Sequence, residues 1–139
     1  RCFKYGIIRQ NGKAMAGIDA LKRGKEYVYL HVEAPDECSH QGDCPGKIKS
    51  MEIIDEKIVK PIYDYLSSKG EPFKILILPD HPTPIAIKTH TSDPVPFVLY
   101  DSTKEIYNEN NAFDEIAADE SGIFFDAGYK LADYFLDKK

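Results

Sequence analysis

The sequence predicts an α/β fold, a layered sheet with helices on both faces. Short runs of β-branched and aromatic residues alternate with longer segments of helical periodicity, which is the order typical of this class. Polar motifs follow two of the short runs directly. In α/β sheets, ligands bind outside the carboxyl ends of the strands. We therefore expect a functional site where the strands of this chain end.

Three short segments are predicted to form buried strands. They are residues 27–32, 73–78 and 95–100, each rich in valine, isoleucine, leucine or aromatic residues. Segments of this composition are too short for typical helices, and turn-forming residues flank them.

Helices are predicted at residues 13–23, 47–69 and 128–138, where apolar residues recur at helical spacing. Gly24 and Gly70 follow the first two segments, as is common at helix ends. Pro61 lies inside the second segment and has no amide hydrogen, so we expect a kink or a break there. The acidic stretch 114–120 is predicted to form a solvated helix face.

Composition narrows the class of protein. A length of 139 residues corresponds to one domain, and a net charge of −5 without a basic stripe argues against nucleic acid as a partner. No apolar stretch reaches the roughly 18 to 20 residues that span a bilayer, and the first ten residues do not resemble a signal peptide. Three cysteines, with spacing unlike that of structural zinc sites, indicate reduced thiols in a cytoplasmic protein.

All four histidines lie in two short motifs, residues 31–40 and 79–90. Asp36 and His40 are four residues apart, so a helical turn would let both bind one ion. Asp80 and His81 are adjacent. Imidazole and carboxylate are the ligands preferred by Mn²⁺, Zn²⁺ and iron. A core role is the ordinary alternative for any single histidine, but this clustering predicts a metal-assisted reaction.

The residues alone leave two arrangements open. Neighbouring side chains at a strand end point to opposite sides, so one ion binds both Asp80 and His81 only if the backbone turns before Pro82. Either one ion takes ligands from both motifs, or two ions lie close together. A pair of ions about 4 Å apart is typical of enzymes that handle phosphoryl oxygens.

Three segments together resemble a known family. HVEAPDECSH at 31–40, PDHPTP at 79–84 and KTHTSDPVP at 88–96 are similar to the C-terminal metal-binding part of cofactor-independent (2,3-bisphosphoglycerate-independent) phosphoglycerate mutases. The closest likeness is to their archaeal-type branch, within the alkaline-phosphatase-like metalloenzyme superfamily. The resemblance extends from Gly12 onward and implies that residues 1–139 are the C-terminal part of the metalloenzyme domain. The nucleophile half and the substrate-binding insert domain are then absent from this chain.

The resemblance also implies a ligand set. Asp36, His40 and His90 are expected to bind one divalent metal, and Asp80 and His81 the second. Manganese is the expected metal, with zinc or magnesium as alternatives. The family's remaining ligands, an N-terminal aspartate and the serine that becomes phosphorylated, have no counterpart in these residues, so the chain by itself is expected to be inactive.

Two further residues are candidates for supporting roles. His31 could orient a metal ligand or contact substrate, although a hydrogen-bonded core histidine fits the sequence equally well. Lys88 could face a phosphate as a point charge, although a solvated surface lysine is the favoured interpretation.

The resemblance implies that the parent protein interconverts 3-phosphoglycerate and 2-phosphoglycerate, a step of glycolysis and gluconeogenesis, through a phosphoserine intermediate. Its partners would be a small phosphorylated substrate and the missing N-terminal half of the same protein. One alternative is another phosphoryl-transfer enzyme of this branch, such as the proposed homoserine kinase, or a phosphatase. The alternative outside enzymes is a metal-free α/β module that only binds a partner.

Overall fold

The computed structural model describes residues 2–104, 106 and 112–137, with residues 2–11 described through their backbone. The chain divides into two compact units. The first comprises Arg1–Glu71 and Thr83–Thr91, and the second comprises Pro72–Pro82 and Ser92–Lys139. None of the helices in the described part of the chain has both the length and the apolar character that crossing a bilayer requires.

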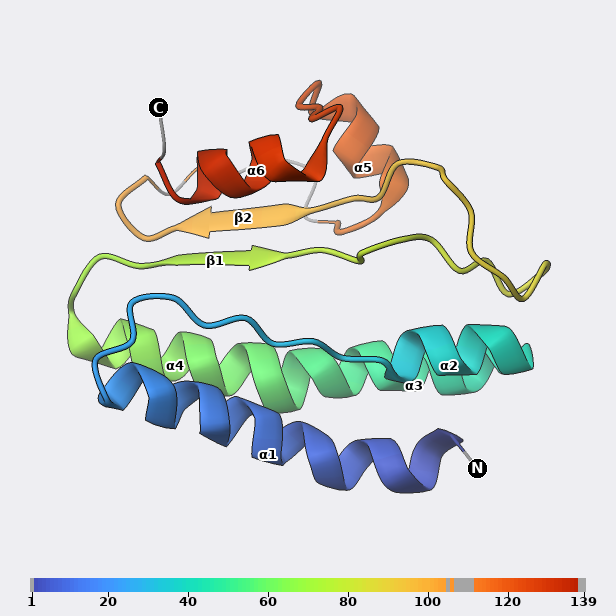
Figure 1. Ribbon diagram of the computed structural model, residues 1–139, viewed down its shortest axis with the longest axis horizontal. Helices are drawn as coiled ribbons and strands as arrows, with labels where there is room; N and C mark the ends of the chain where they lie inside the picture. Colours follow the sequence, from blue (N-terminus) through green and yellow to red (C-terminus); the bar gives the residue numbers. More distant parts are fainter. Residues whose placement is uncertain (1, 105, 107–111, 138–139) are drawn as a thin grey trace. The chain divides into compact units, whose positions relative to one another are not determined.

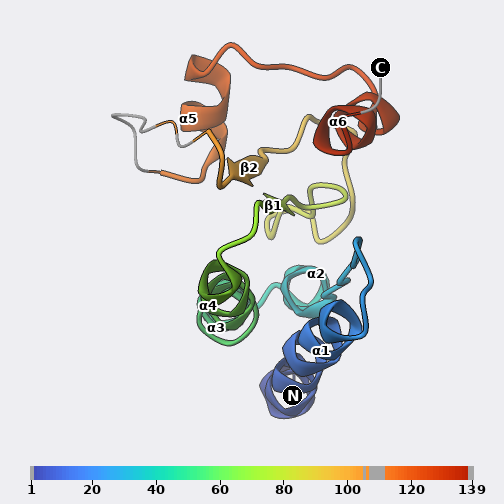
Figure 2. The same cartoon turned by 90° about the vertical axis from the view of Figure 1, so that its left-hand side faces the viewer.

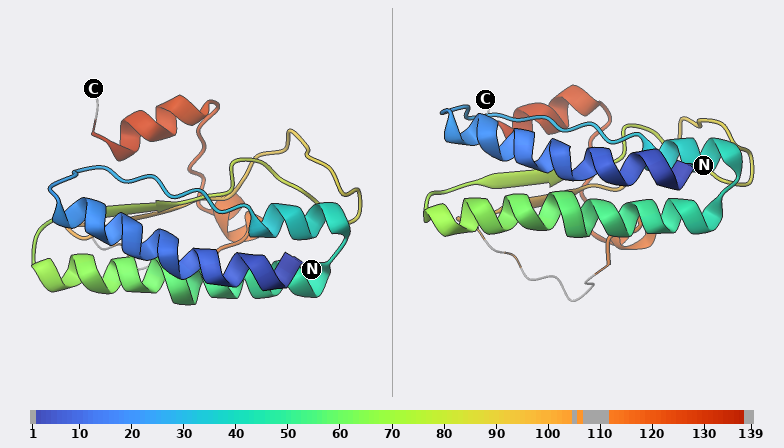
Figure 3. Two further views of the ribbon diagram at one scale, coloured as in Figure 1. Left: turned by 60° about the horizontal axis from the view of Figure 1, so that its bottom comes forward. Right: turned by 90° about the horizontal axis from the view of Figure 1, so that it is seen from below.

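The first unit is helical. It contains α1 (Cys2–Lys22), α2 (Ala34–Gln41), α3 (Cys44–Ile54), the π-helical turn η1 (Asp55–Val59) and α4 (Lys60–Lys69). Helices α3, η1 and α4 follow one another as one long rod, and α1 lies alongside it (Figures 1 and 3). Figure 2 shows α1 next to α2. The helices meet on a small apolar core that includes Ala14, Ile18, Ile53 and Ile58.

The prediction of a long helix over 47–69 is confirmed. A kink or a break was expected at Pro61, and a break into two separate helices is absent. Instead, the backbone widens into the π-helical turn just before the proline, where the amide of Lys60 donates to the carbonyl of Asp55. A proline removes one helical hydrogen bond, and its ring crowds the preceding turn. A local π-helical turn relieves this conflict while the chain stays helical.

The strand predicted at 27–32 is wrong. The segment is extended, and its residues alternate in exposure, with Val28 and Leu30 half-buried and Tyr27 and Tyr29 exposed. The inward side chains pack on α1 at Gly17, where an added Cβ would lie 3.4 Å from Leu30. A strand requires a hydrogen-bonded neighbour, and in the described part of the chain β1 and β2 pair only with each other.

The second unit holds the sheet. Strands β1 (Lys74–Ile77) and β2 (Val98–Asp101) pair antiparallel, with Ile75 opposite Tyr100. Helices α5 (Glu115–Glu120) and α6 (Gly128–Phe135) follow. The predicted strands at 73–78 and 95–100 and the helix at 128–138 are confirmed with shifted ends, residue 138 lying outside the described residues. The α/β class is therefore confirmed.

Capping and aromatic packing organise the second unit. The Asp114 carboxylate accepts from the amide of Ala117 at 2.8 Å and starts α5 within the acidic stretch. Phe125 contacts both Phe97 and Tyr134, with ring centroids 5.8 and 5.4 Å apart. These ring contacts join the approach to β2 to helix α6.

A cluster of charged side chains lies at the end of the two-stranded sheet where β1 begins and β2 ends. Lys74 Nζ lies 2.7 Å from Asp137 and 3.9 Å from Asp101. The hydrogen bond to Asp137 raises the pKa of Lys74. Asp101 accepts from the hydroxyl and the amide of Thr103, and these bonds, assisted by the charge of Lys74, lower the pKa of Asp101.

We predict that Asp101→Asn destabilises the chain at neutral pH, because the amide keeps an acceptor for Thr103 but loses the charge. The folded pKa of Asp101 is lowered, so its contribution is present above the unfolded value of about 4 and is lost as pH falls through the folded pKa. Urea unfolding should therefore show a stability difference that shrinks in acid. Asp119→Asn, at an exposed position of α5, is the matched control. If wild type and Asp101→Asn differed in their free energy of unfolding by the same amount at neutral and at acidic pH, the prediction would be contradicted.

Candidate metal centre

Helix α2 places two of the predicted ligands on one face. Pro35 lies in its first turn, where the missing amide hydrogen costs nothing, and Asp36 and His40 are one turn apart. Cys38 and Ser39 lie between them in sequence and are buried. The helix ends at Gly42, whose φ of 72° is readily adopted by glycine. Burial of one face of α2 thus leaves the carboxylate and the imidazole on the accessible side.

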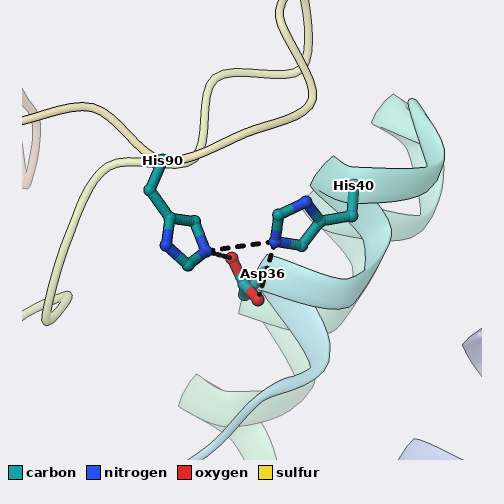
Figure 4. Close-up of side chains that lie close together, drawn as sticks. All are labelled: Asp36, His40 and His90. Atoms are coloured by element: carbon teal, nitrogen blue, oxygen red, sulfur yellow. Dashed lines mark hydrogen bonds and ion pairs between the residues drawn. The ribbon is translucent and has the colours of Figure 1, made fainter.

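The third ligand comes from a loop of the same unit. Residues 83–91 begin at the buried Thr83 and turn at Pro84, whose carbonyl accepts from the amide of Lys88 at 2.9 Å. Lys88 has a φ of 55°, in the left-handed region. This turn brings His90 against the exposed face of α2 (Figure 4).

The three side chains converge on one point (Figure 4). His40 Nε2 is 3.4 Å from Asp36 Oδ2, and His90 Nε2 is 3.3 Å from Asp36 Oδ1. The two Nε2 atoms are 3.1 Å apart. The donor atoms all lie within 4.8 Å of one another, so one ion could contact all three.

The donor set fits a divalent metal. Ligand atoms about 2.0–2.2 Å from a metal, at the angles of tetrahedral or octahedral coordination, lie roughly 3 Å from one another. His40 Nδ1 is 2.8 Å from the carbonyl oxygen of Lys88, which can only accept a hydrogen bond. Nδ1 therefore carries the hydrogen, and Nε2 directs its lone pair at the cluster, as in histidines that ligate metals.

Sequence reasoning missed two groups that support this cluster. The Thr83 hydroxyl donates to Asp36 Oδ1 at 2.6 Å, and the Lys88 carbonyl accepts from His40. Thr83 lies between two prolines in the second histidine motif, and this position is the only feature of the sequence that could have indicated its role at the cluster. No residue pattern reports where a main-chain carbonyl points.

Lys88 contributes through its backbone, while its side chain is exposed. The stem crosses Gly42, where an added Cβ would lie 2.6 Å from Lys88 Cε. The exposure agrees with the favoured interpretation of a solvated lysine. A contact with phosphate stays a prediction.

His31 lies outside the three-residue cluster. It is exposed on the extended segment before α2, and its ring faces Tyr29, with Nδ1 3.4 Å from the phenolic oxygen. Its carbonyl accepts from Lys13 of α1. These contacts fix the segment leading into α2, while a supporting role for the His31 ring in catalysis stays a prediction.

Asp80 and His81 belong to the second unit and follow β1. Asp80 Oδ1 accepts from the amide of His81 at 3.2 Å, and Oδ2 lies 3.5 Å from His81 Nε2. The backbone bends at these two residues, before Pro82, so the side chains face each other instead of pointing to opposite sides. This bend meets the condition under which both residues could bind the same ion.

Comparison with known proteins identifies the family. The sequence of residues 6–126 matches the protein-family model of the metalloenzyme superfamily. The chain belongs to this superfamily. The predicted resemblance to this superfamily is confirmed. No solved structure matches the chain.

Several curated relatives are named 2,3-bisphosphoglycerate-independent phosphoglycerate mutase. The relative from Methanosarcina mazei is 51% identical over 111 residues, which cover 80% of this chain and 28% of that protein. The relative from Methanosarcina barkeri is 48% identical over 119 residues, covering 86% of this chain and 30% of that protein. A probable mutase from Geobacter sulfurreducens is 41% identical over 135 residues, covering 96% and 33%. The chain thus spans a third or less of these relatives.

Proposed function

We propose that these residues are the C-terminal part of the metalloenzyme domain of a 2,3-bisphosphoglycerate-independent phosphoglycerate mutase. The whole protein would interconvert 3-phosphoglycerate and 2-phosphoglycerate through a phosphoserine. The observation that supports this most is the convergence of Asp36, His40 and His90 in a chain whose relatives carry that name. The serine nucleophile and the substrate-binding insert would be supplied by the rest of the protein.

In this proposal, Asp36, His40 and His90 hold one divalent metal, Mn²⁺ by preference, and Asp80 and His81 contribute to a second. A bound divalent metal neutralises phosphoryl oxygens and favours ionisation of the serine hydroxyl. The chain's own residues keep this centre open, because the side chains of His40 and His90 are 41% and 49% exposed. Closed structural sites, by contrast, surround their metal with four protein ligands.

The charge of the ligand set favours an anionic substrate. Asp36 supplies one negative charge, and the two imidazoles bind a metal in their neutral form. A divalent ion held by these three groups keeps a net positive charge. Such a centre attracts phosphate, because unneutralised charge near a protein surface acts over several ångströms. A homoserine kinase or a phosphatase of the same branch would attract its phosphorylated substrate with the same positive charge.

The decisive assay uses protein produced from the complete gene. We expect conversion of 3-phosphoglycerate to 2-phosphoglycerate without added 2,3-bisphosphoglycerate, dependent on Mn²⁺ and lost in chelator. His90→Ala should lower kcat at least about 100-fold, the upper end of the loss seen when groups supporting a metal ligand are removed. Glu37→Gln, on the exposed part of the same helix, should stay near wild type.

Other outcomes of this assay would redirect the assignment. Phosphorylation of homoserine, or release of inorganic phosphate without isomerisation, would place the protein with the alternative phosphoryl-transfer enzymes. Absence of both bound metal and metal-dependent activity would favour the binding module. The 139-residue chain alone should give no turnover, because a phosphoryl-transfer site needs its nucleophile held near the reacting group.

A further inference from the structure

We infer that residues 83–91 form a positioning segment, which sets the orientation of both α2 ligands as well as supplying His90. Thr83 orients Asp36, and the Lys88 carbonyl orients His40. The inference rests on the proposed function, because it assigns these groups to the same metal centre. Both are positioning groups, since they act through the ligands and not on a substrate.

Thr83 determines how the Asp36 carboxylate is turned. The hydroxyl donates to Oδ1 at 2.6 Å, and Oδ1 is also the oxygen that faces His90 at 3.3 Å. Oδ2 is then left facing His40. Rotation of a carboxylate about its last torsion is only weakly restricted, so this bond selects the orientation that serves both histidines.

Thr83 is itself firmly held. The residue is 5% exposed, and Lys47 of α3 donates to its carbonyl at 3.0 Å. Prolines on either side restrict its backbone further. A buried hydroxyl with a fixed backbone can impose a direction on a half-exposed carboxylate, whereas a mobile surface hydroxyl cannot.

The backbone of Lys88 is strained at the same residue whose carbonyl orients His40. Its φ of 55° is disfavoured for residues other than glycine, because the Cβ then crowds the following carbonyl oxygen. The residue's carbonyl accepts from His40 Nδ1 at 2.8 Å, and its stem lies over Gly42 at the end of α2. Strain kept at such a position indicates a function for the conformation. Here the function is to hold His40 Nε2 toward the centre.

The first test removes the Thr83 hydroxyl. Thr83→Val keeps the branched shape without the donor, whereas Thr83→Ser keeps the donor. In calorimetric titration of the 139-residue chain with Mn²⁺, we expect Thr83→Val to weaken affinity about 10-fold or more and Thr83→Ser to stay within about 3-fold, as for other groups that support metal ligands. Thr103→Val is the matched control, because it also removes a threonine hydroxyl that donates to an aspartate, but at Asp101 of the second unit.

The second test separates the Lys88 backbone from its side chain. Lys88→Gly and Lys88→Val both remove the charge and the stem, but only glycine accepts a φ of 55° without strain. We expect Lys88→Gly to keep Mn²⁺ affinity and Lys88→Val to lose about 10-fold, because a β-branched residue tolerates positive φ less well than lysine does. In the metal-free chain, ¹⁵N NMR should show the His40 ring protonated at Nδ1 in wild type and Lys88→Gly, and a mixture of tautomers in Lys88→Val.

The outcomes distinguish this inference from the proposed function. No Mn²⁺ binding by the wild-type chain would count against the proposed centre, while the His40 tautomer would still report on the Lys88 carbonyl. Wild-type binding that is lost in Asp36→Asn supports the centre. If the wild-type chain binds Mn²⁺ in this way, two further results together would refute the positioning segment. Thr83→Val would bind Mn²⁺ as tightly as Thr83→Ser, and Lys88→Val would bind it as tightly as Lys88→Gly.

Discussion

Asp36→Asn should lower the affinity of the chain for Mn²⁺ by at least about 100-fold, which exceeds the typical loss from removing a group that only supports a ligand. Asp36 is the charged donor of the cluster, and each of its oxygens faces one histidine, at 3.3 and 3.4 Å. Asparagine keeps the shape but replaces one oxygen with an amide nitrogen, which donates and has no lone pair for a metal. The substitution therefore removes charge and one donor atom together.

Titration calorimetry on the wild-type chain and two variants measures this effect. Glu37→Gln is the matched control, because it removes one negative charge from the next position of α2, where the side chain is exposed. We expect its Mn²⁺ affinity to remain within about 3-fold of wild type, since an exposed charge outside the cluster is largely screened. Equal losses in both variants would mean that general electrostatics and not ligation by Asp36 controls binding. An unchanged affinity in Asp36→Asn would mean that the metal binds elsewhere.

The part of this centre that could be predicted from residues alone is the part that depends on local geometry. Asp36 and His40 are four residues apart, and any helix brings such a pair to one face. The place of His90 in the same ligand group came from the family resemblance, because the turn that returns it to α2 contains a lysine with positive φ. Thr83 and the Lys88 carbonyl were not predictable, since neither residue type is a habitual metal-site group.

The misassigned strand at 27–32 shows what propensity measures. Its residues favour an extended backbone with alternate sides buried, and both features are present. Hydrogen-bonded pairing is a property of two segments, so the composition of one cannot supply it. At Pro61, sequence correctly located a perturbation, but whether a helix breaks or widens depends on its neighbours, and here the rod is packed against α1.

The bend at Asp80 and His81 was foreseen as one of two possibilities. A proline disfavours helical backbone at the residue before it, and Pro82 follows His81 directly. Whether the two side chains would meet depended on the dihedral angles of both residues, which the sequence does not specify. The structure has them facing each other, with the Asp80 carboxylate accepting from the amide of His81.

The two predicted ligand groups differ in the number of donors they offer, three against two, and this difference leads to a prediction of how many metal ions the chain binds. The 139-residue chain should bind at most one Mn²⁺, at Asp36, His40 and His90. These three donors already lie within 4.8 Å of one another and resemble the three-ligand catalytic sites that leave positions open for water. Asp80 and His81 offer two donors, and Asp80 is 58% exposed on its side chain, so water competes with them fully.

Asp80 and His81 are expected to bind a metal ion only weakly without further ligands. Asp80 already accepts from the His81 amide and faces the His81 ring, and a metal would have to displace or reorganise those contacts for only two bonds. The double variant Asp80→Asn, His81→Ala should therefore leave both the stoichiometry and the affinity of Mn²⁺ binding unchanged, whereas His40→Ala should abolish binding at the measured concentrations. Calorimetry or metal analysis of the dialysed chain decides the matter. Two tight, equivalent Mn²⁺ sites per chain would show that Asp80 and His81 bind without further ligands, and would overturn the argument from donor number.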